Sequence, residues 1–406
     1  MLTKSINTMH TKGLRTICPH TLPHTTYRIQ FHKDFNFNAL ESIIPYLHEL
    51  GVDTIYASPI LRSTPGSMHG YDGTDMQKID PELGTLADLR RIRNQLNLYG
   101  IKWLQDIVPN HMAFHPDNAW LMDLLEFGPT STHASYFDTC FVGNMFEPGK
   151  LIVPILAKEV HDAIDDGEIT IALVEKRLYL KYFDNCYPLS PETYCTVLED
   201  HLRKVKNDFS GFLVRVNTAQ ANGNQQEWQT LRNEILADIF DIDLQNYLYA
   251  VNNTKYRLKE LIEIQFYELC PWWTTNHRIN YSRFFTVNGL ICINVQHPEV
   301  FRETHRFIKE LIEEKLIDGL RIDHIDGLYS PNQYLKDLRD YVGPDIYIVV
   351  EKILERNEDL PQIWPIQGTT GYEFLSACNN LITCAKGKKQ FDFYYNQLTG
   401  NKRPLK

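Results

Sequence analysis

The chain has 406 residues, which exceeds an average domain but suits a single α/β barrel that carries an insertion. Its 41 basic and 51 acidic residues give a formal net charge of −10, which argues against nucleic acid or an anionic membrane as the main partner and suits a neutral substrate. Eight scattered cysteines, with no C-x-x-C pair and no signal peptide, are typical of free thiols in a reducing cytosol, so we expect a cytoplasmic protein.

The first part of the chain alternates between predicted strands and helices. Residues 1–24 are rich in Thr and His without any periodicity, and we expect a loose leader there. Between residues 25 and 109, apolar strand-like stretches are separated by amphipathic helices, which indicates βαβ units and a parallel sheet. The predicted strands are 25–31, 53–60 and 101–109, and the predicted helices are 38–51 and 86–100.

This alternation stops at residue 110 and resumes near residue 303. Segment 110–302 combines loops and short strands with two long polar helices, predicted at 197–216 and 227–251, and it is too long for a structureless loop. We therefore predict one or two inserted subdomains after the third strand. The alternation returns in residues 303–406, with predicted strands at 319–323, 345–354 and 368–374 and predicted helices at 303–318 and 331–341.

These elements predict an α/β protein of the (β/α)8 TIM-barrel type, with about six strands in this chain and a large insertion after strand 3. After residue 374 we expect one helix and a ragged end. Barrel closure would require two more βα units, and an open parallel edge exposes unpaired backbone groups. We therefore expect residues 1–406 alone to behave as a truncated and poorly soluble protein with little or no activity.

The segment GLRIDHIDGL, residues 319–328, joins a buried strand to charged groups. Arg321 and Asp323 are two residues apart, and such positions on a strand lie on the same face. A guanidinium beside a carboxylate lowers the pKa of the acid, which is expected to keep Asp323 ionised. The C-terminal ends of the strands are where α/β barrels hold their active sites. A purely structural ion pair is the alternative interpretation of this segment.

Acidic residues lie at the ends of three predicted strands. The third strand contains Asp106 and runs into His111, the fourth ends in Asp323 and His324, and the fifth ends its apolar run in Glu351. A lone acid at a strand end is more often structural. A parallel barrel, however, brings all these ends to one rim, so we predict an active site there.

Two carboxylates in different surroundings suggest the acid/base pair of sugar chemistry. Asp323 is expected to stay ionised and act as the nucleophile. Glu351 leaves an apolar strand, so we expect burial to raise its pKa to roughly 6–7, which suits a general acid. Carboxyl groups about 5–5.5 Å apart would give a reaction with retention. Apolar faces for pyranose rings are offered by Trp103, Trp120, Trp272, Trp273 and the 22 tyrosines, of which we expect most in the core and only one or two at the sugar.

Several longer motifs are more specific than the barrel pattern. They are TYRIQF, IYASPILRSTPGSMHGYD, DIVPNHM, INYSRFFTVNGL, GLRIDHIDGL, VVEKIL and QGTTGYEFL, in this order between about residues 25 and 376. Together they resemble the maltooligosyl trehalose synthases of the α-amylase superfamily (glycoside hydrolase family 13). General α-amylases share the short barrel motifs but lack PGSxHGYD and GTTGYEFL.

The resemblance implies a (β/α)8 barrel with a domain inserted after strand three, no cofactor or required metal, and a maltooligosaccharide substrate. It implies a glucosylmutase reaction, in which a retaining double displacement converts the reducing-end α-1,4 linkage into an α,α-1,1 linkage. It also implies a functional partnership with a maltooligosyl trehalose hydrolase. By motif, Asp323 is the nucleophile and Glu351 the acid/base. The residues implied to contact the substrate are Tyr71, Asp72, His111, Arg321, His324 and Lys352.

The sequence departs from the family pattern in three places. Residues 286–290 read TVNGL and residue 296 is Gln, where acids are common in the family. The superfamily also uses a third carboxylate in a late His-Asp pair, whereas the last histidine here is His324. A contribution on the order of 4 kcal/mol from that group would correspond to a loss of roughly a thousandfold in rate. In α-amylases at large an asparagine such as Asn110 often binds calcium, but the resembled subfamily does not depend on it.

Two other functions fit the same barrel. One is an α-1,4-glucan hydrolase or 4-α-glucanotransferase, which would release glucose or redistribute chain lengths. The other, of a different class, is a glucan-binding fragment that binds without turnover.

Overall fold

The computed structural model describes residues 22–140, 149–237 and 241–400. Most of the predicted leader, residues 1–24, lies outside these ranges. Its last residue, His24, is described and hydrogen-bonds the Asp53 carboxylate 2.9 Å away. Within the three ranges, none of the helices combines the length and the apolar character that crossing a bilayer requires.

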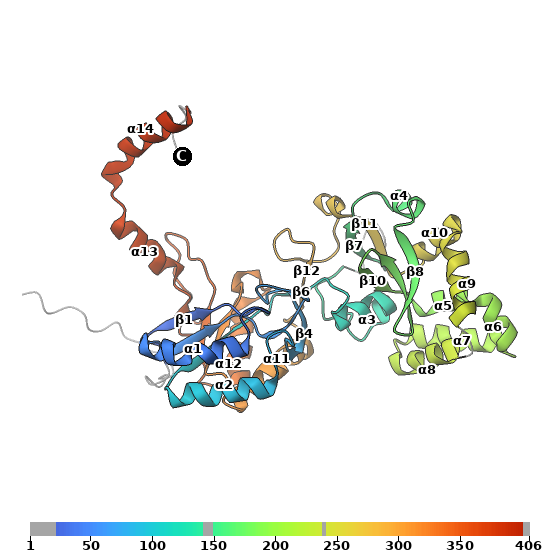
Figure 1. The fold of residues 1–406 in the computed structure, drawn as a ribbon, viewed down its shortest axis with the longest axis horizontal. Coiled ribbons are helices and arrows are strands. Elements are labelled where there is room, and N and C mark those ends of the chain that lie inside the picture. The colour runs from blue at the N-terminus through green and yellow to red at the C-terminus, as the bar shows by residue number, and fades with distance from the viewer. Residues whose placement is uncertain (1–21, 141–148, 238–240, 401–406) are drawn as a thin grey trace, which may run out of the picture.

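A curled parallel sheet of six strands forms the centre of one lobe, which we call the barrel lobe (Figure 1). Each strand pairs in parallel with its neighbours, as expected for the barrel predicted from the sequence. The fold class is therefore confirmed as a partial (β/α)8 barrel. In sheet order the strands are β1 (Thr26–Ile29), β2 (Thr54–Ala57), β5 (Lys102–Ile107), β13 (Gly319–Ile322), β14 (Tyr347–Val350) and β15 (Gly368–Thr369).

Helices pack against this sheet and bury one face each. In α11 the residues Val300, Thr304, Ile308 and Leu311 are buried, and their spacing of three and four places them on one helical face. A capping box, in which Thr85 and Asp88 exchange hydrogen bonds, begins α2. The helices of this layer are α1 (Phe37–Glu49), α2 (Leu86–Leu98), α11 (Pro298–Glu313) and α12 (Pro331–Val342), and β3 (Leu61–Ser63) and β4 (Gly73–Ile79) form a hairpin before α2.

The chain leaves the sheet after β5 and returns at α11, and most of the segment between them forms a second lobe, green to yellow in Figure 1. An antiparallel sheet, β8-β9-β10, and a group of helices make up this lobe. Its elements are β6 (His111–Ala113), α3 (Ala119–Phe127), β7 (Leu151–Leu156), α4 (Val160–Asp165), β8 (Ile169–Val174), β9 (Arg177–Tyr182), β10 (Asn185–Pro188), α5 (Pro191–Val197), α6 (Glu199–Val205), α7 (Phe209–Ala221), α8 (Gln225–Ala237), α9 (Asp241–Asn252), α10 (Lys255–Glu263), β11 (Tyr267–Pro271) and β12 (Leu290–Cys292).

The prediction of one long helix over 197–216 is wrong. Three helices, α5, α6 and α7, cover this stretch. The side chain of Asp208 accepts a hydrogen bond from the Gly211 backbone N–H at 2.8 Å and so begins a new helix at Phe209. The apolar periodicity continues across this break, which is why the break was not predicted.

Two C-terminal helices follow β15, where we predicted one helix and a ragged end. They are α13 (Tyr372–Ile382) and α14 (Lys388–Thr399), and neither contains a buried residue. Figure 1 shows them extending away from the sheet. Their apolar side chains therefore add nothing to the core of the barrel lobe.

Helix α2 offers a matched test of where the core lies. Leu96 is fully buried, whereas Leu98, two residues later, is 86% exposed. Because the first substitution leaves a cavity, Leu96→Ala should lower the free energy of unfolding by about 2–5 kcal/mol. Leu98→Ala should change it by less than about 0.5 kcal/mol. Urea denaturation followed by circular dichroism measures both, and equal effects would contradict the packing of α2.

Candidate active site

Polar side chains gather where β5, β13 and β14 end. Ile322, the last residue of β13, pairs with Ile107 of β5 on one side and with Val350 of β14 on the other. Asp323 and Glu351 come directly after these paired positions, so the two acids leave adjacent strands at the same level. Neighbouring strands lie about 4.8 Å apart, which keeps the two carboxyl groups close.

Arg321 joins the acids into one cluster. Its Nη1 atom lies 2.6 Å from Asp323 Oδ1 and 2.8 Å from Asp106 Oδ1, and its Nη2 atom lies 3.1 Å from Glu351 Oε1. Only 7% of the Arg321 side chain is exposed. One buried guanidinium therefore binds three carboxylates from three consecutive strands.

Asp106 lies at the bottom of the cluster with its side chain fully buried. Its Oδ2 atom accepts hydrogen bonds from Tyr71 at 2.6 Å, from Arg28 at 3.1 Å and from Tyr56 at 3.2 Å. Asp106 thus connects Arg321 with β1, β2 and the loop that carries Tyr71. A carboxylate held this tightly suits a structural role more than a chemical one.

Arg28 and Tyr56 were not among the residues predicted for the site, although the sequence contains a signal for them. The sheet register pairs Arg28 with Tyr56 and Tyr56 with Leu104, so all three point the same way as Asp106, two residues beyond Leu104. An arginine and a tyrosine inside apolar strands are the clue, and it becomes readable only once the register is known.

The pKa values of the two acids are the reverse of our prediction. Burial raises the pKa of Asp323 to about 7, even though Arg321 opposes this effect. Burial also acts to raise the pKa of Glu351, but Arg321, the His324 backbone N–H and the Tyr372 hydroxyl outweigh it, and the net shift is downward. The expectation of an ionised Asp323 and a protonated Glu351 in the free protein is therefore wrong.

The cause is a difference in burial and hydrogen bonding. Asp323 has 9% of its side chain exposed and a second acid, Asp106, beside it, whereas Glu351 is 22% exposed. Glu351 accepts hydrogen bonds from the His324 N–H at 3.0 Å and from the Tyr372 hydroxyl at 3.1 Å. Hydrogen bonds to the charged form favour ionisation.

Both histidines predicted for the site lie at its edge. Burial lowers the pKa of His111 to about 4, helped by His324, so its imidazole is neutral. Its Nε2 atom is buried and has no hydrogen-bond partner among the described residues. The ring of Phe284 lies between them, 4.6 Å from the His111 ring and 4.9 Å from the His324 ring.

A tight turn holds His324 in place. Its backbone adopts φ +46°, in the left-handed region, and a Cβ atom on Gly327 would lie 2.2 Å from its ring. Position 327 therefore requires glycine. This turn directs the His324 backbone N–H towards Glu351.

The other predicted residues lie at different distances from the acids. Tyr71 donates to Asp106 and belongs to the cluster. Asp72 accepts hydrogen bonds from Thr64 and Ser67 and stabilises its own loop. Lys352 pairs with Asp326 at 3.2 Å and with Glu358 at 2.6 Å, on the loop beyond the acids.

Tyr372 is a member of the cluster to which we assigned no role. It begins α13 within the motif QGTTGYEFL and hydrogen-bonds Glu351 across 21 residues of sequence. The sequence signal for Tyr372 was its place in this specific motif. A hydroxyl that contacts an acid/base influences the pKa of that group.

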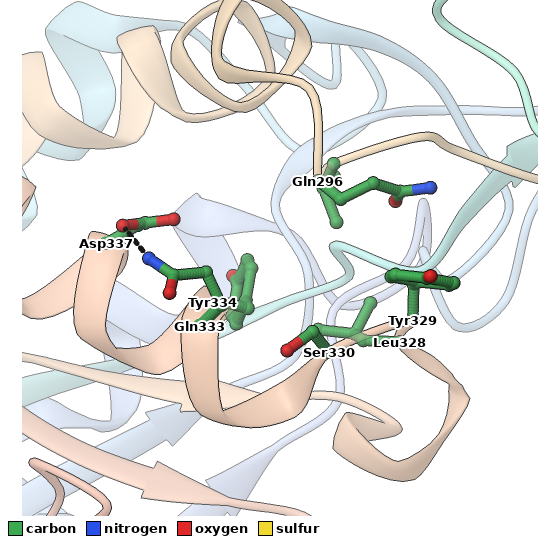
Figure 2. Close-up of a pocket in the computed structure, with 8 residues that line it drawn as sticks. Gln296, Leu328, Tyr329, Ser330, Gln333, Tyr334 and Asp337 are labelled. Atoms are coloured by element: carbon green, nitrogen blue, oxygen red, sulfur yellow. Dashed lines mark hydrogen bonds between the residues drawn. The ribbon is translucent and has the colours of Figure 1, made fainter.

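A cavity of about 320 Å³ lies next to the loop that follows β13 (Figure 2). Gln296 and Tyr329 border it on one side, and the hydrogen-bonded pair Gln333 and Asp337 borders it on the other. Neither Asp323 nor Glu351 lines it. The cavity therefore lies beside the strand ends and does not contain the carboxylate pair.

The surroundings of Asn110 do not fit a calcium ion. Its side-chain nitrogen lies 3.3 Å from His111 Nδ1 and 3.6 Å from Cys292 Sγ. Calcium prefers six to eight oxygen ligands, and a thiol with an imidazole is a poor substitute. The residues around Asn110 are therefore unsuited to holding calcium.

Comparison with known proteins supports the resemblance noted in the motifs. A family model described as the α-amylase catalytic domain matches residues 8–150. A putative maltooligosyl trehalose synthase of Mycobacterium tuberculosis is 29% identical over 372 residues, which cover 90% of this chain and 39% of that protein.

Solved structures give the same result. A glycosyltrehalose synthase superposes with a TM-score of 0.72 at 36% identity, over 93% of this chain and 44% of the other. A maltooligosyltrehalose synthase from Arthrobacter ramosus superposes with a TM-score of 0.70 at 31% identity, over 94% of this chain and 41% of the other. This chain is similar to maltooligosyl trehalose synthases. It spans about two-fifths of the length of these relatives.

The raised pKa of Asp323 predicts how stability depends on pH. An Asp in the unfolded chain titrates near roughly pH 4, and the folded carboxyl titrates at about 7. Between these values the folded state binds the extra proton, so this group makes the free energy of unfolding fall as the pH rises. Glu351 acts in the opposite sense, but only in the acidic range below its ordinary pKa, because its shift is downward.

We therefore expect Asp323→Asn to remove this loss. The difference in Tm between the variant and the unchanged protein should become more positive from about pH 5.5 to about pH 7.5. Asp340→Asn, at an exposed position on α12, is the control and should leave the pH dependence unchanged. A flat difference for Asp323→Asn, measured by thermal denaturation, would contradict the raised pKa.

Proposed function

We propose that this chain carries the catalytic carboxylate pair of a maltooligosyl trehalose-forming enzyme. The proposed reaction moves the reducing-end glucosyl unit of a maltooligosaccharide from an α-1,4 to an α,α-1,1 linkage. The observation that carries the proposal is the pair Asp323 and Glu351, on adjacent strand ends and bridged by Arg321. The likeness to maltooligosyl trehalose synthases supports this reaction over others of the same fold.

Two displacements account for the proposed change. Glu351 protonates the oxygen of the terminal α-1,4 linkage while Asp323 attacks the anomeric carbon, which forms a glycosyl-enzyme and frees one glucose. Glu351, now ionised, accepts the proton of the anomeric hydroxyl of that glucose, whose oxygen attacks the intermediate and releases Asp323. The α configuration is kept because each step inverts it once. Closely spaced carboxyl groups support this retaining route over an inverting one.

The pKa values support a pair that holds a single proton near neutral pH. The first step needs one proton on the pair, and it needs that proton on Glu351. In the free protein the proton favours Asp323. Both carboxylates contact the guanidinium of Arg321 from adjacent strand ends, so the proton has a short path. We infer that the substrate's linkage oxygen, placed beside Glu351, moves the proton across and leaves Asp323 ionised.

The surrounding residues would position the sugar. The Nε2 atom of His111, which has no partner among the described residues, is available to a sugar hydroxyl, and His324 lies beside the acid/base through its backbone N–H. We assign Tyr71 and Asp72 to the loop beside the cleaved bond, and Arg321 to holding the nucleophile. Lys352, paired with Asp326 and Glu358, would hold the outer loop in place and would not contact the sugar directly.

The proposal divides the chain by role. Residues 25–109 and 303–406 would supply the barrel strands with the catalytic pair, and residues 110–302 the insertion that helps to enclose the glucose. Enclosure matters because a water molecule at the glycosyl-enzyme would release free glucose. A hydrolase that works together with this enzyme would act on its product, as the resemblance implies.

Glu351→Gln tests the acid/base role. Because the amide cannot donate the proton, kcat on maltopentaose should fall by roughly a hundredfold or more. On an α-glucosyl fluoride, whose leaving group needs no proton, a large part of the activity should return. Asp323→Asn should stay inactive on both substrates, because it lacks the nucleophile in either case.

The control for this experiment is Glu49→Gln, at an exposed glutamate that ends α1, which should keep its activity. Absence of recovery on the fluoride by folded Glu351→Gln would remove Glu351 from the acid role. Full activity of Asp323→Asn on either substrate would remove Asp323 from the nucleophile role.

The products formed from maltopentaose decide the reaction itself. The purified chain, and any longer protein encoded by its reading frame, are incubated with maltopentaose and the products are separated by chromatography. We expect maltotriosyl trehalose, a non-reducing product of unchanged mass. Glucose with maltotetraose would show a hydrolase instead, and redistributed chain lengths a 4-α-glucanotransferase. Binding without any product from either form would overturn the proposal in favour of a glucan-binding protein.

A further inference from the structure

A second, more polar cavity of about 460 Å³ lies in the inserted lobe. Residues of α3, β9 and α8 line it, and the first and last of these helices are seen in the right-hand lobe of Figure 1. These elements carry none of the acids of the candidate active site. A ligand of this cavity would thus contact none of those acids.

Arg232, on α8, is the main feature of this cavity. The residue is 5% exposed, and its Nε atom has no hydrogen-bond partner among the described residues. Its ion pair with Glu126 spans 3.7 Å between Nη1 and Oε1, which is too long for a hydrogen bond. A guanidinium offers five donors, and burying its charge costs free energy unless acceptors compensate. The site is therefore short of a hydrogen-bond acceptor.

Glu126 does not supply that acceptor. Its Oε1 atom accepts a hydrogen bond of 2.6 Å from the indole N–H of Trp228. Burial raises the pKa of Glu126 and so favours its neutral form, in spite of Arg177 and Arg232. Beside Arg177 and Arg232 the cavity thus has Glu126, which reaches Arg232 only through this long ion pair.

Burial and the neighbouring Arg177 both act on the pKa of Arg232. Burial lowers the pKa of Arg232, and the nearby charge of Arg177 lowers it further. The other inner acid, Asp123, is occupied, because His133 lies 2.7 Å from it and Ser131 and Gln225 hydrogen-bond it. Asp117 also lines the cavity but is exposed. The buried Nε atom of Arg232 therefore still needs an acceptor, which a ligand could supply.

Helix α8 adds a second contribution from its first turns. Gln225, Trp228 and Gln229 line the cavity and belong to the N-terminal half of this helix, which begins at Gln225. The N-terminus of a helix carries a partial positive charge that favours anions. The dipole and the two guanidinium groups therefore act in the same sense.

We propose that this cavity binds a small phosphate-bearing anion, with Arg232 as its principal ligand and Arg177 as the second. Two oxygens of a tetrahedral phosphate can accept the two parallel hydrogen bonds that a guanidinium fork donates. The volume of the cavity exceeds that of phosphate alone, so the cavity can hold either the free anion or a phosphate carried by a small sugar. A neutral glucan would supply hydroxyl groups but no charge to compensate the arginines.

Titration calorimetry on the purified full chain tests the proposal, with inorganic phosphate and glucose 6-phosphate as probes at fixed ionic strength. We expect saturable binding of at least one probe. Arg232→Gln should weaken it at least tenfold, and Arg232→Lys by less, because lysine keeps the charge but loses the fork. Arg215→Gln is the matched control, since Arg215 is an exposed arginine of neighbouring α7 that pairs with Glu227. It should bind as tightly as the unchanged chain.

The two probes distinguish the source of the phosphate. Tighter binding of glucose 6-phosphate by tenfold or more indicates a sugar phosphate, and equal binding indicates the free anion. If Arg232→Gln does not fold, as judged by circular dichroism, Arg177→Gln decides in its place and should also weaken binding. Absence of saturable binding to the unchanged chain, folded variants that bind as tightly as it does, or binding of maltose without phosphate would each overturn the proposal.

Discussion

One guanidinium surrounded by three carboxylates is the interaction on which the candidate site depends. Arg321 contacts Asp106, Asp323 and Glu351, which come from β5, β13 and β14. Burying these charges is expensive, and the cost is offset only because each acid reaches the same cation at hydrogen-bonding distance. Loss of Arg321 would leave the buried Asp323 without its cation and Asp106 with Arg28 alone. The cluster therefore fixes both the chemistry of the rim and the register of the strands beneath it.

The same arrangement explains why the two outer acids titrate differently. A shared cation stabilises both carboxylates, so the difference between them comes from burial and from the remaining hydrogen bonds. Glu351 has the His324 N–H and the Tyr372 hydroxyl, whereas Asp323 is more deeply buried and lies beside Asp106. One proton thus stays on the pair near neutral pH. A retaining glycosyl transfer needs that proton on its acid/base. In the proposed reaction, substrate binding therefore has to move the proton from Asp323 to Glu351.

The inserted segment takes part in the rim as well as forming its own lobe. Its first strand, β6, pairs antiparallel with its last strand, β12, so that His111 lies opposite Cys292. This pairing brings Phe284 against the rings of His111 and His324. An insertion anchored in this way can influence the site through its first and last residues, while its distant part remains free for another ligand.

The sequence alone determined the parallel βα architecture, the position of the insertion and the strand ends that carry the acids, because each follows from local periodicity or from motifs. It did not determine the direction of the two pKa shifts. Adjacency of Arg321 and Asp323 predicted an ionised Asp323, but the pKa depends on burial and on Asp106, 217 residues away in sequence. Likewise, no local pattern brings together Arg232 and Glu126, which lie on separate helices 106 residues apart. Only tertiary packing, which removes water and brings distant charges together, decides how such groups behave.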